Sequence, residues 1–237
     1  MSEDILVIPD IHGRAFWRDA VEAMPDADTI FLGDYHDPYP DEGISPEQSL
    51  TNFRDIMAYA RTHPNVQLLL GNHDLHYLCS FGEQCRIDFA NSLEIYSLLY
   101  DNLWHMKVAV ERTVAGRKVV FSHAPILRGW LREIGLSDNL SELVKALNSV
   151  ARKVASDPWS AERLLNPIGY VRGGDNEFGS PVWADISEIE RGELIESADY
   201  SIFGHTRLEE PIITDRWADL DCRHAFRITP SLSIFPL

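Results

Sequence analysis

The stretch Ile30-Phe-Leu-Gly-Asp-Tyr-His-Asp37 joins an apolar run to two carboxylates, Asp34 and Asp37. The run from Thr29 to Leu32 is typical of a short buried β-strand, and Gly33 lets the backbone turn sharply where that strand ends. Asp34 would then lie at the carboxyl edge of a sheet, which is the usual position of a reaction site in α/β proteins. We therefore expect this strand end to carry chemistry.

Four further apolar runs end in Asp, His or Asn. The runs and the residues that follow them are Ile5–Pro9 before Asp10-Ile-His12-Gly13, Val66–Leu70 before Gly71-Asn-His-Asp74, Val119–Ser122 before His123-Ala-Pro125, and Tyr200–Phe203 before Gly204-His-Thr206. One Asp or Asn after a strand is commonly only a turn residue. Five such junctions in one chain indicate a single shared site.

The remaining pattern predicts an α/β chain. Apolar residues at helical spacing follow the first strand over 14–24, and the capping box Ser45-Pro-Glu-Gln48 opens a helix that ends near His63. This alternation of strand and helix predicts parallel strands in the N-terminal part. Helices are expected over 86–103 and most of 125–154, a hairpin over 106–122, and short strands after 211. Two sheets with helices outside are therefore expected.

The length of 237 residues is consistent with a single domain, 1–237, in which a helical and loop region at about 125–198 is expected to shape the pocket. No apolar stretch approaches membrane-spanning length and no leader opens the chain, so a cytoplasmic location is expected. Cys79, Cys85 and Cys222 form no Cys-x-x-Cys pair and are expected to be reduced packing residues.

The formal net charge of −16 argues against nucleic acid or an anionic membrane as a partner, because both attract clustered Lys and Arg. The charge is compatible with a phosphorylated substrate, since metal ions reverse the local sign of a pocket lined by carboxylates. A phosphoprotein, a small phosphomonoester or a nucleotide would fit such a pocket.

The residues at the strand ends suit divalent metal ions. Carboxylate oxygens and imidazole nitrogens without thiolates bind manganese, iron or zinc. Two ions about 3.5–4 Å apart clamp a phosphate and lower the pKa of a bridging water. Asp10, His12 and Asp34 can serve the first ion, and Asp34, Asn72, His123 and His205 the second.

The motifs Asp-x-His-Gly, Gly-Asp-x-x-Asp, Gly-Asn-His-Asp, Ser-His-Ala and Gly-His-Thr, in this order, resemble those of the calcineurin-like metallophosphoesterases. The last two resemble the phosphoprotein phosphatase branch, which includes bacterial and phage phosphatases and diadenosine tetraphosphatases. The resemblance covers residues 10 to about 206. It implies an α/β (α+β) four-layer fold, with two mixed β-sheets packed face to face and flanked by helices. It implies the same metal ligands, with His73 as the general acid and Asp37 as its orienting partner.

The chain departs from this branch at the phosphate clamp. The branch usually has Gly-Asp-x-Val-Asp-Arg-Gly, in which the arginine holds the substrate phosphate, whereas Pro38 and Tyr39 follow Asp37 here. Arg172 lies between His123 and His205 in the sequence, which is the order of the branch's second phosphate-binding arginine. We therefore expect Arg172 to bind substrate.

The sequence predicts a dinuclear metal-dependent phosphoric ester hydrolase. A metal-bridging hydroxide would attack phosphorus in line, and His73 would protonate the leaving oxygen. A phosphomonoester is the first expected substrate, with phosphoserine and phosphothreonine as candidates, and manganese is the first expected metal, with iron and zinc as alternatives. Two other functions stay open: a nucleotide phosphoanhydride hydrolase of the diadenosine tetraphosphatase type, and a non-catalytic metal-binding scaffold.

Overall fold

The computed structural model of the chain describes residues 3–79, 85–154 and 156–237. The chain divides into two compact units. The first unit comprises Met1–Met106 and Arg223–Leu237, and the second comprises Lys107–Cys222.

The first unit contains a six-stranded mixed sheet. Its strands, in spatial order, are β11 (Ile234–Pro236), β10 (Phe226–Ile228), β1 (Ile5–Ile8), β2 (Asp28–Phe31), β3 (Val66–Leu69) and β4 (Met106–Lys107). β1, β2 and β3 run parallel, and β10 returns antiparallel to β1. Ile8 pairs with Phe31, which is in register with Leu68, so the carboxyl ends of the three parallel strands lie level at one edge.

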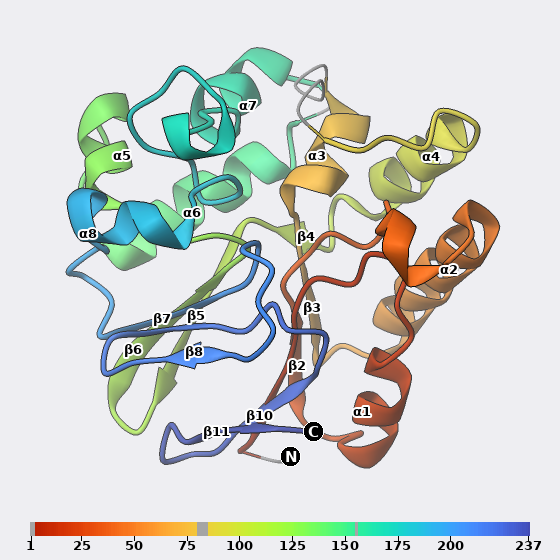
Figure 1. Cartoon of the computed structure of the whole chain (residues 1–237). Helices are drawn as coiled ribbons and strands as arrows, with labels where there is room; N and C mark the ends of the chain where they lie inside the picture. Colours follow the sequence, from red (N-terminus) through yellow and green to blue (C-terminus); the bar gives the residue numbers. More distant parts are fainter. Residues whose placement is uncertain (1–2, 80–84, 155) are drawn as a thin grey trace. The chain divides into compact units, whose positions relative to one another are not determined.

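Two helices connect the parallel strands of this unit. They are α1 (Trp17–Ala23) and α2 (Pro46–Thr62), preceded by the 3-10 helix η1 (Pro40–Glu42), and α1 and α2 lie on the same side of the sheet (Figure 1). The expected capping box is confirmed: the Ser45 hydroxyl accepts a hydrogen bond from the Gln48 N–H, and the Gln48 side chain accepts one from the Ser45 N–H. Apolar residues of α2, among them Phe53 and Ile56, are fully buried.

Two further helices of the first unit differ from expectation. α3 (Asn72–Leu78) starts directly at the Gly-Asn-His-Asp motif. The sequence did not predict this helix, because all seven of its residues are buried and show no amphipathic spacing. α4 (Ser92–Asn102) begins later than the expected start at 86, and residues 86–88 form an irregular segment instead.

The second unit contains a five-stranded mixed sheet. Its spatial order is β5 (Ala109–Val114), β6 (Arg117–Ser122), β7 (Tyr200–Phe203), β9 (Trp217–Asp219) and β8 (Ile212–Ile213). β5 and β6 form the expected hairpin, with Ala115 and Gly116 at positive φ in its turn, but it starts at Ala109, because residues 106–107 form β4 of the other sheet. β6 and β7 run parallel with Phe121 opposite Ile202, so their carboxyl ends also lie at one edge.

The helices of the second unit lie between β6 and β7 in the sequence. They are α5 (Arg128–Ile134), α6 (Leu140–Ala151), α7 (Pro158–Leu165) and α8 (Ile189–Gly192), with the 3-10 helices η3 (Tyr170–Arg172) and η4 (Ile186–Glu188). Asn139 caps α6 as expected. The buried Asn148 of α6 bonds to the Val108 and Ala109 N–H groups and to the Ala109 carbonyl, which ties α6 to β5.

The α/β class and the two mixed sheets with helices are confirmed. Among the helices that the structure describes, none has the length and apolar character needed to cross a lipid bilayer.

Candidate metal centre

Several of the expected site residues have an unusual backbone conformation. His12, Asp34 and Asp37 in the first unit have φ values of 44°, 52° and 58°, and His205 in the second unit has 71°. Non-glycine residues rarely adopt this left-handed region, at a cost of about 1–3 kcal/mol each, and such residues cluster at functional sites. The turns after β1, β2 and β7 therefore hold these side chains against a local backbone preference.

Asp34 is fixed against the start of α3. Its Oδ1 accepts a hydrogen bond from the His73 N–H at 2.9 Å, and its own N–H donates to Oδ2 of Asp74 at 2.9 Å. A Cβ atom on Gly71 would overlap the Asp34 carboxylate, so only glycine fits there. This close approach explains the glycine of the Gly-Asn-His-Asp motif.

Asp74 joins the turns that follow β2 and β3. Its carboxylate accepts hydrogen bonds from the N–H groups of Gly71, Asp34 and Tyr35, at 2.8, 2.9 and 3.1 Å. Complete burial raises the pKa of Asp74 to about 7, although the three N–H donors oppose this rise by favouring the carboxylate. Asp74 thus positions Asp34 by accepting the hydrogen bond of the Asp34 backbone N–H.

His12 is prepared to bind a cation. Its Nδ1 lies 3.0 Å from the His36 carbonyl and 3.1 Å from the Asp37 carbonyl, so Nδ1 carries the proton and Nε2 carries the lone pair. Nε2 lies 3.4 Å from Oδ2 of Asp34. Burial, followed by the nearby cationic side chains, lowers the pKa of His12 well below its usual value, which keeps the imidazole neutral.

Asp10 and Asn72 complete the expected ligands of the first unit, and both are buried. Arg14 donates to the Asp10 carbonyl at 3.1 Å and forms a bidentate pair with Glu42, so this arginine is buried in support of the turn after β1. The Asn72 amide NH₂ donates to the Cys85 sulfur at 3.3 Å, which leaves its oxygen as the atom suited to a metal.

His73 is held by a carboxylate. Its Nδ1 lies 2.8 Å from Oδ2 of Asp37, while the Tyr77 hydroxyl donates to Oδ1 of Asp37 at 2.5 Å. The ring is perpendicular to that of His12, with centroids 5.0 Å apart. Ligand atoms of His12, Asp34 and His73 lie within 4.8 Å of one another, so the expected general acid sits directly beside the expected metal ligands of this unit.

The two expected ligands of the second unit are in contact. His123 follows β6 and His205 follows β7, and Nε2 of His123 lies 3.1 Å from Nδ1 of His205. Two imidazole nitrogens bound to one ion at about 2.0–2.1 Å lie roughly 3 Å apart when they are neighbours in the coordination sphere. The donor atoms of this pair are therefore spaced for one shared cation.

Arg172 lies beside His205 in the same unit. Its Nη2 donates to the Thr206 hydroxyl at 3.0 Å and approaches the His205 carbonyl to 3.5 Å. Its Nε lies 2.9 Å from Oδ2 of Asp185. The expected substrate-binding arginine is thus next to an expected ligand, with part of its charge offset by Asp185.

The structure reveals an arginine that the sequence motifs did not indicate. The Arg86 guanidinium stacks on the Tyr39 ring, 3.9 Å from its centroid, donates to the Asp37 carbonyl at 2.9 Å, and lies 3.4 Å from Nδ1 of His12. Within the described residues its Nε is buried without a hydrogen-bond partner. Tyr39 replaces the glycine of the family motif and provides the ring on which Arg86 stacks. This replacement was the one feature of the sequence that indicated the contact.

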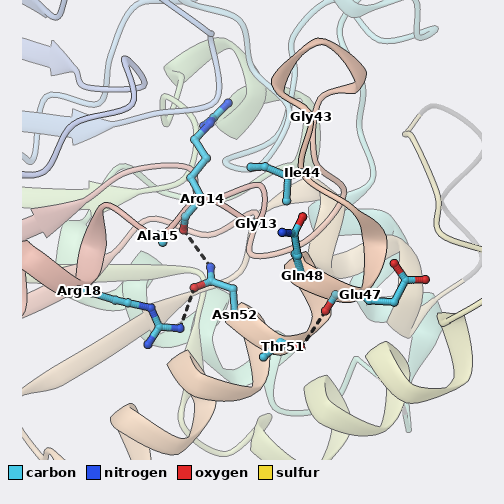
Figure 2. A pocket seen from close by; sticks show the side chains of 10 residues that line it. All are labelled: Gly13, Arg14, Ala15, Arg18, Gly43, Ile44, Glu47, Gln48, Thr51 and Asn52. Atoms are coloured by element: carbon cyan, nitrogen blue, oxygen red, sulfur yellow. Dashed lines mark hydrogen bonds between the residues drawn. The ribbon is translucent and has the colours of Figure 1, made fainter.

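Two cavities of the first unit adjoin these residues. One of about 340 Å³ is lined by residues 37–40 and 86–89 with Ile44 and Pro46. A second of about 550 Å³ lies over the turn after His12, where Figure 2 shows Arg14 and Arg18 with Asn52 between them. Arg14 is paired with Glu42 and Arg18 with Asp55, so the larger cavity offers an anion little uncompensated charge.

The fold and the donor atoms define a metal-dependent phosphatase, and comparison with known proteins agrees. The chain belongs to the calcineurin-like phosphoesterase family, whose model matches residues 4–207. This family implies divalent metal ions and phosphorylated substrates. The comparison with curated proteins found no match.

Solved structures share the fold at low sequence identity. The cold-active protein-tyrosine phosphatase of the psychrophile Shewanella sp. is 14% identical, with a TM-score of 0.61 over 100% of this chain and 81% of that chain. Another structure of a cold-active protein tyrosine phosphatase is 15% identical, with a TM-score of 0.62 over 100% of this chain and 79% of that chain.

Proposed function

We propose that this phosphatase hydrolyses phosphomonoesters, with phosphoserine and phosphothreonine as the first substrate class, and that it uses two divalent ions. The proposed ligands are those that the sequence motifs indicate: Asp10, His12, Asp34, Asn72, His123 and His205. This set contains nitrogen and oxygen donors only, which supports manganese, with iron or zinc as alternatives. Bound ions would activate water and offset the charge of the phosphate.

The observation that carries the proposal is the bond between His73 and Asp37. Because Asp37 occupies Nδ1, the proton that His73 can transfer is on Nε2. The Tyr77 hydroxyl donates to the other oxygen of the Asp37 carboxylate, so the carboxylate and the His73 ring are held in one orientation. The alkoxide of serine or threonine is a poor leaving group that needs such a proton, so this arrangement favours alkyl phosphomonoesters.

We assign to Arg86 the phosphate contact that Pro38 cannot make. Guanidinium groups bind phosphate oxygens in pairs, and Arg86 lies next to both His12 and the backbone of Asp37. A buried N–H without a partner costs about 1–3 kcal/mol, and a phosphate oxygen at the Arg86 Nε would remove that cost. Arg172 is the proposed second contact.

The smaller cavity supports a substrate with an organic part next to the phosphate. It opens beside Asp37 and Arg86, and Pro38, Pro40 and Phe89 line it. Phe89 is 80% exposed, and an exposed aromatic side chain next to prolines is suited to a peptide segment. One solved relative of the same fold is named as a protein-tyrosine phosphatase, so phosphotyrosine peptides belong among the substrates to be tested.

The test is phosphate release by the manganese-loaded protein from matched peptides carrying phosphoserine, phosphothreonine or phosphotyrosine, and from diadenosine tetraphosphate. We expect the highest kcat/KM for the phosphoserine or phosphothreonine peptide. Turnover of diadenosine tetraphosphate alone would replace the proposal with a phosphoanhydride hydrolase, and no turnover of any substrate would favour a metal-binding scaffold.

A further inference from the structure

A second group of metal-binding side chains, none of them among the six proposed ligands, lies at α3 and in the segment before α4. One ring nitrogen each of His73 and His76 and the sulfur of Cys85 lie within 4.8 Å of one another. His76 follows His73 by three residues, so the two imidazoles project from the same face of the helix. Cys85 comes from the irregular segment before α4 and already contacts Asn72.

Among the described residues, no hydrogen bond accounts for a histidine at the buried position 76, and a bound ion would account for it. Its side chain is 1% exposed, and neither ring nitrogen has a hydrogen-bond partner among the residues that the structure describes. Nε2 approaches Oδ2 of Asp37 only to 3.5 Å. A buried polar atom left without a partner costs about 1–3 kcal/mol, and an ion is one of the recognised explanations for such an atom.

We propose that His73, His76 and Cys85 bind a soft divalent ion such as Zn²⁺, and that this third site inhibits the enzyme by withdrawing His73 from proton transfer. We infer the binding of the ion from the spacing of the three side chains and from the lack of hydrogen bonds to His76 within the described residues. The inhibition rests on the proposed function, because it requires His73 to be the general acid.

The geometry of the cluster is compatible with zinc. Tetrahedral zinc with nitrogen at about 2.0 Å and sulfur at about 2.3 Å separates its nitrogen and sulfur ligand atoms by roughly 3.3–3.5 Å, so ligand atoms that lie within 4.8 Å of one another would have to close by at most about 1.5 Å. The Cys85 thiol loses its proton to solvent as the Zn–S bond forms, and water completes the coordination. The Asp37 carboxylate, close to both imidazoles, supplies negative charge beside the ion.

The donor atoms make the site selective. One thiolate and two imidazoles favour zinc and cadmium over manganese and magnesium, which prefer oxygen ligands. The proposed catalytic ligands include no thiolate. A spectroscopic signal from a metal–thiolate bond therefore reports this third site without interference from ions at the catalytic ligands.

The experiment is a titration of the manganese-loaded protein with Cd²⁺ in a buffer without thiols, following the ultraviolet charge-transfer absorption of the cadmium–thiolate bond together with phosphate release. We expect one equivalent of Cd²⁺ to produce the absorption and to lower the rate on phosphoserine at least tenfold. The loss should be smaller on p-nitrophenyl phosphate, whose leaving group needs no acid.

The variants Cys85→Ser and His76→Asn test the ligands. Cys85→Ser should abolish the absorption, and His76→Asn should weaken Cd²⁺ binding at least tenfold. Cys79→Ser is the matched control, because Cys79 is also near α3 but lies outside the cluster, and it should keep both the absorption and the inhibition. Absorption that survives Cys85→Ser would overturn the site. Stoichiometric absorption without loss of turnover would overturn the inhibition, and the absorption decides the site even if the protein hydrolyses no phosphoserine.

Discussion

Oδ2 of Asp37 lies 2.8 Å from Nδ1 of His73, and Oδ1 of the same carboxylate accepts the hydrogen bond of the Tyr77 hydroxyl. All three side chains are buried. Asp37 is therefore fixed from two directions. Because Asp37 occupies Nδ1 of His73, Nε2 is the ring nitrogen that can transfer a proton to the leaving group.

His73→Asn should lower kcat on phosphoserine by about 10²–10⁴, because the alkoxide then leaves without a proton. The loss should be clearly smaller on p-nitrophenyl phosphate. Metal content, measured by elemental analysis, should stay at two ions. Asp37→Asn should show the same dependence on the leaving group in milder form. Equal losses on both substrates, or a lost ion, would make His73 a ligand or a structural residue.

Asp34→Asn should weaken the binding of both ions and remove most activity, since Asp34 is the proposed shared ligand. The fold should remain, because the Asp34 N–H still bonds to Asp74 and an Asn oxygen can still accept from the His73 N–H. Elemental analysis of the dialysed variant is the measurement, with circular dichroism as the control for folding. Two tightly bound ions with near-normal turnover would contradict the assignment.

Arg86→Ala and Arg172→Ala should each reduce kcat/KM by an amount equivalent to about 1–3 kcal/mol, since each removes a charged contact to phosphate. Arg86 should show the larger effect, because Asp185 already pairs with Arg172. Arg54→Ala is the control, because Arg54 is exposed and pairs with Glu94. Unchanged kcat/KM in the Arg86 variant would return this arginine to a structural role on Tyr39.

His76 should make the metal-free protein less stable in acid. Burial lowers the pKa of His76 from 6.5 to about 4, so the unfolded chain binds a proton between these values that the folded chain does not. Stability should therefore fall as the pH drops through this window. From pH 7 to pH 5 the loss from this residue is about 2 kcal/mol in the free energy of unfolding.

His76→Leu removes the titration and should flatten this pH dependence. The measurement is urea unfolding of both proteins at pH 7 and pH 5 after chelation. The comparison uses the change between the two pH values, so a uniform shift in stability caused by the substitution does not affect it. An identical change in the two proteins would show that His76 is accessible to protons in the folded state.

The strands that carry the expected ligands were predictable because their signals are local. β1, β2, β3 and β7 form within one residue of the expected apolar runs and β6 within two, since each is a short apolar run that ends at a turn residue. α3 was missed because a fully buried helix of seven residues shows no amphipathic period. α7 was missed because its cap, Asp157, lies in a stretch without clear periodicity.

The same distinction applies to the site. Asp10, His12, Asp34, Asn72, His123 and His205 each follow a strand, so their positions at the sheet edges were a consequence of the motifs. Arg86 reaches the Asp37 carbonyl across 49 residues of sequence. That contact depends on stacking against Tyr39, a tertiary interaction that no spacing rule indicates.

The central claim is that two divalent ions bound by this chain are required for hydrolysis, and stoichiometric reconstitution tests it most directly. The chelator-stripped protein is titrated with Mn²⁺, and bound ions and p-nitrophenyl phosphate hydrolysis are measured at every step. We predict no turnover without metal and a rise that reaches its plateau at two bound ions per chain. Turnover in the stripped protein, or full turnover with one bound ion, would contradict the account.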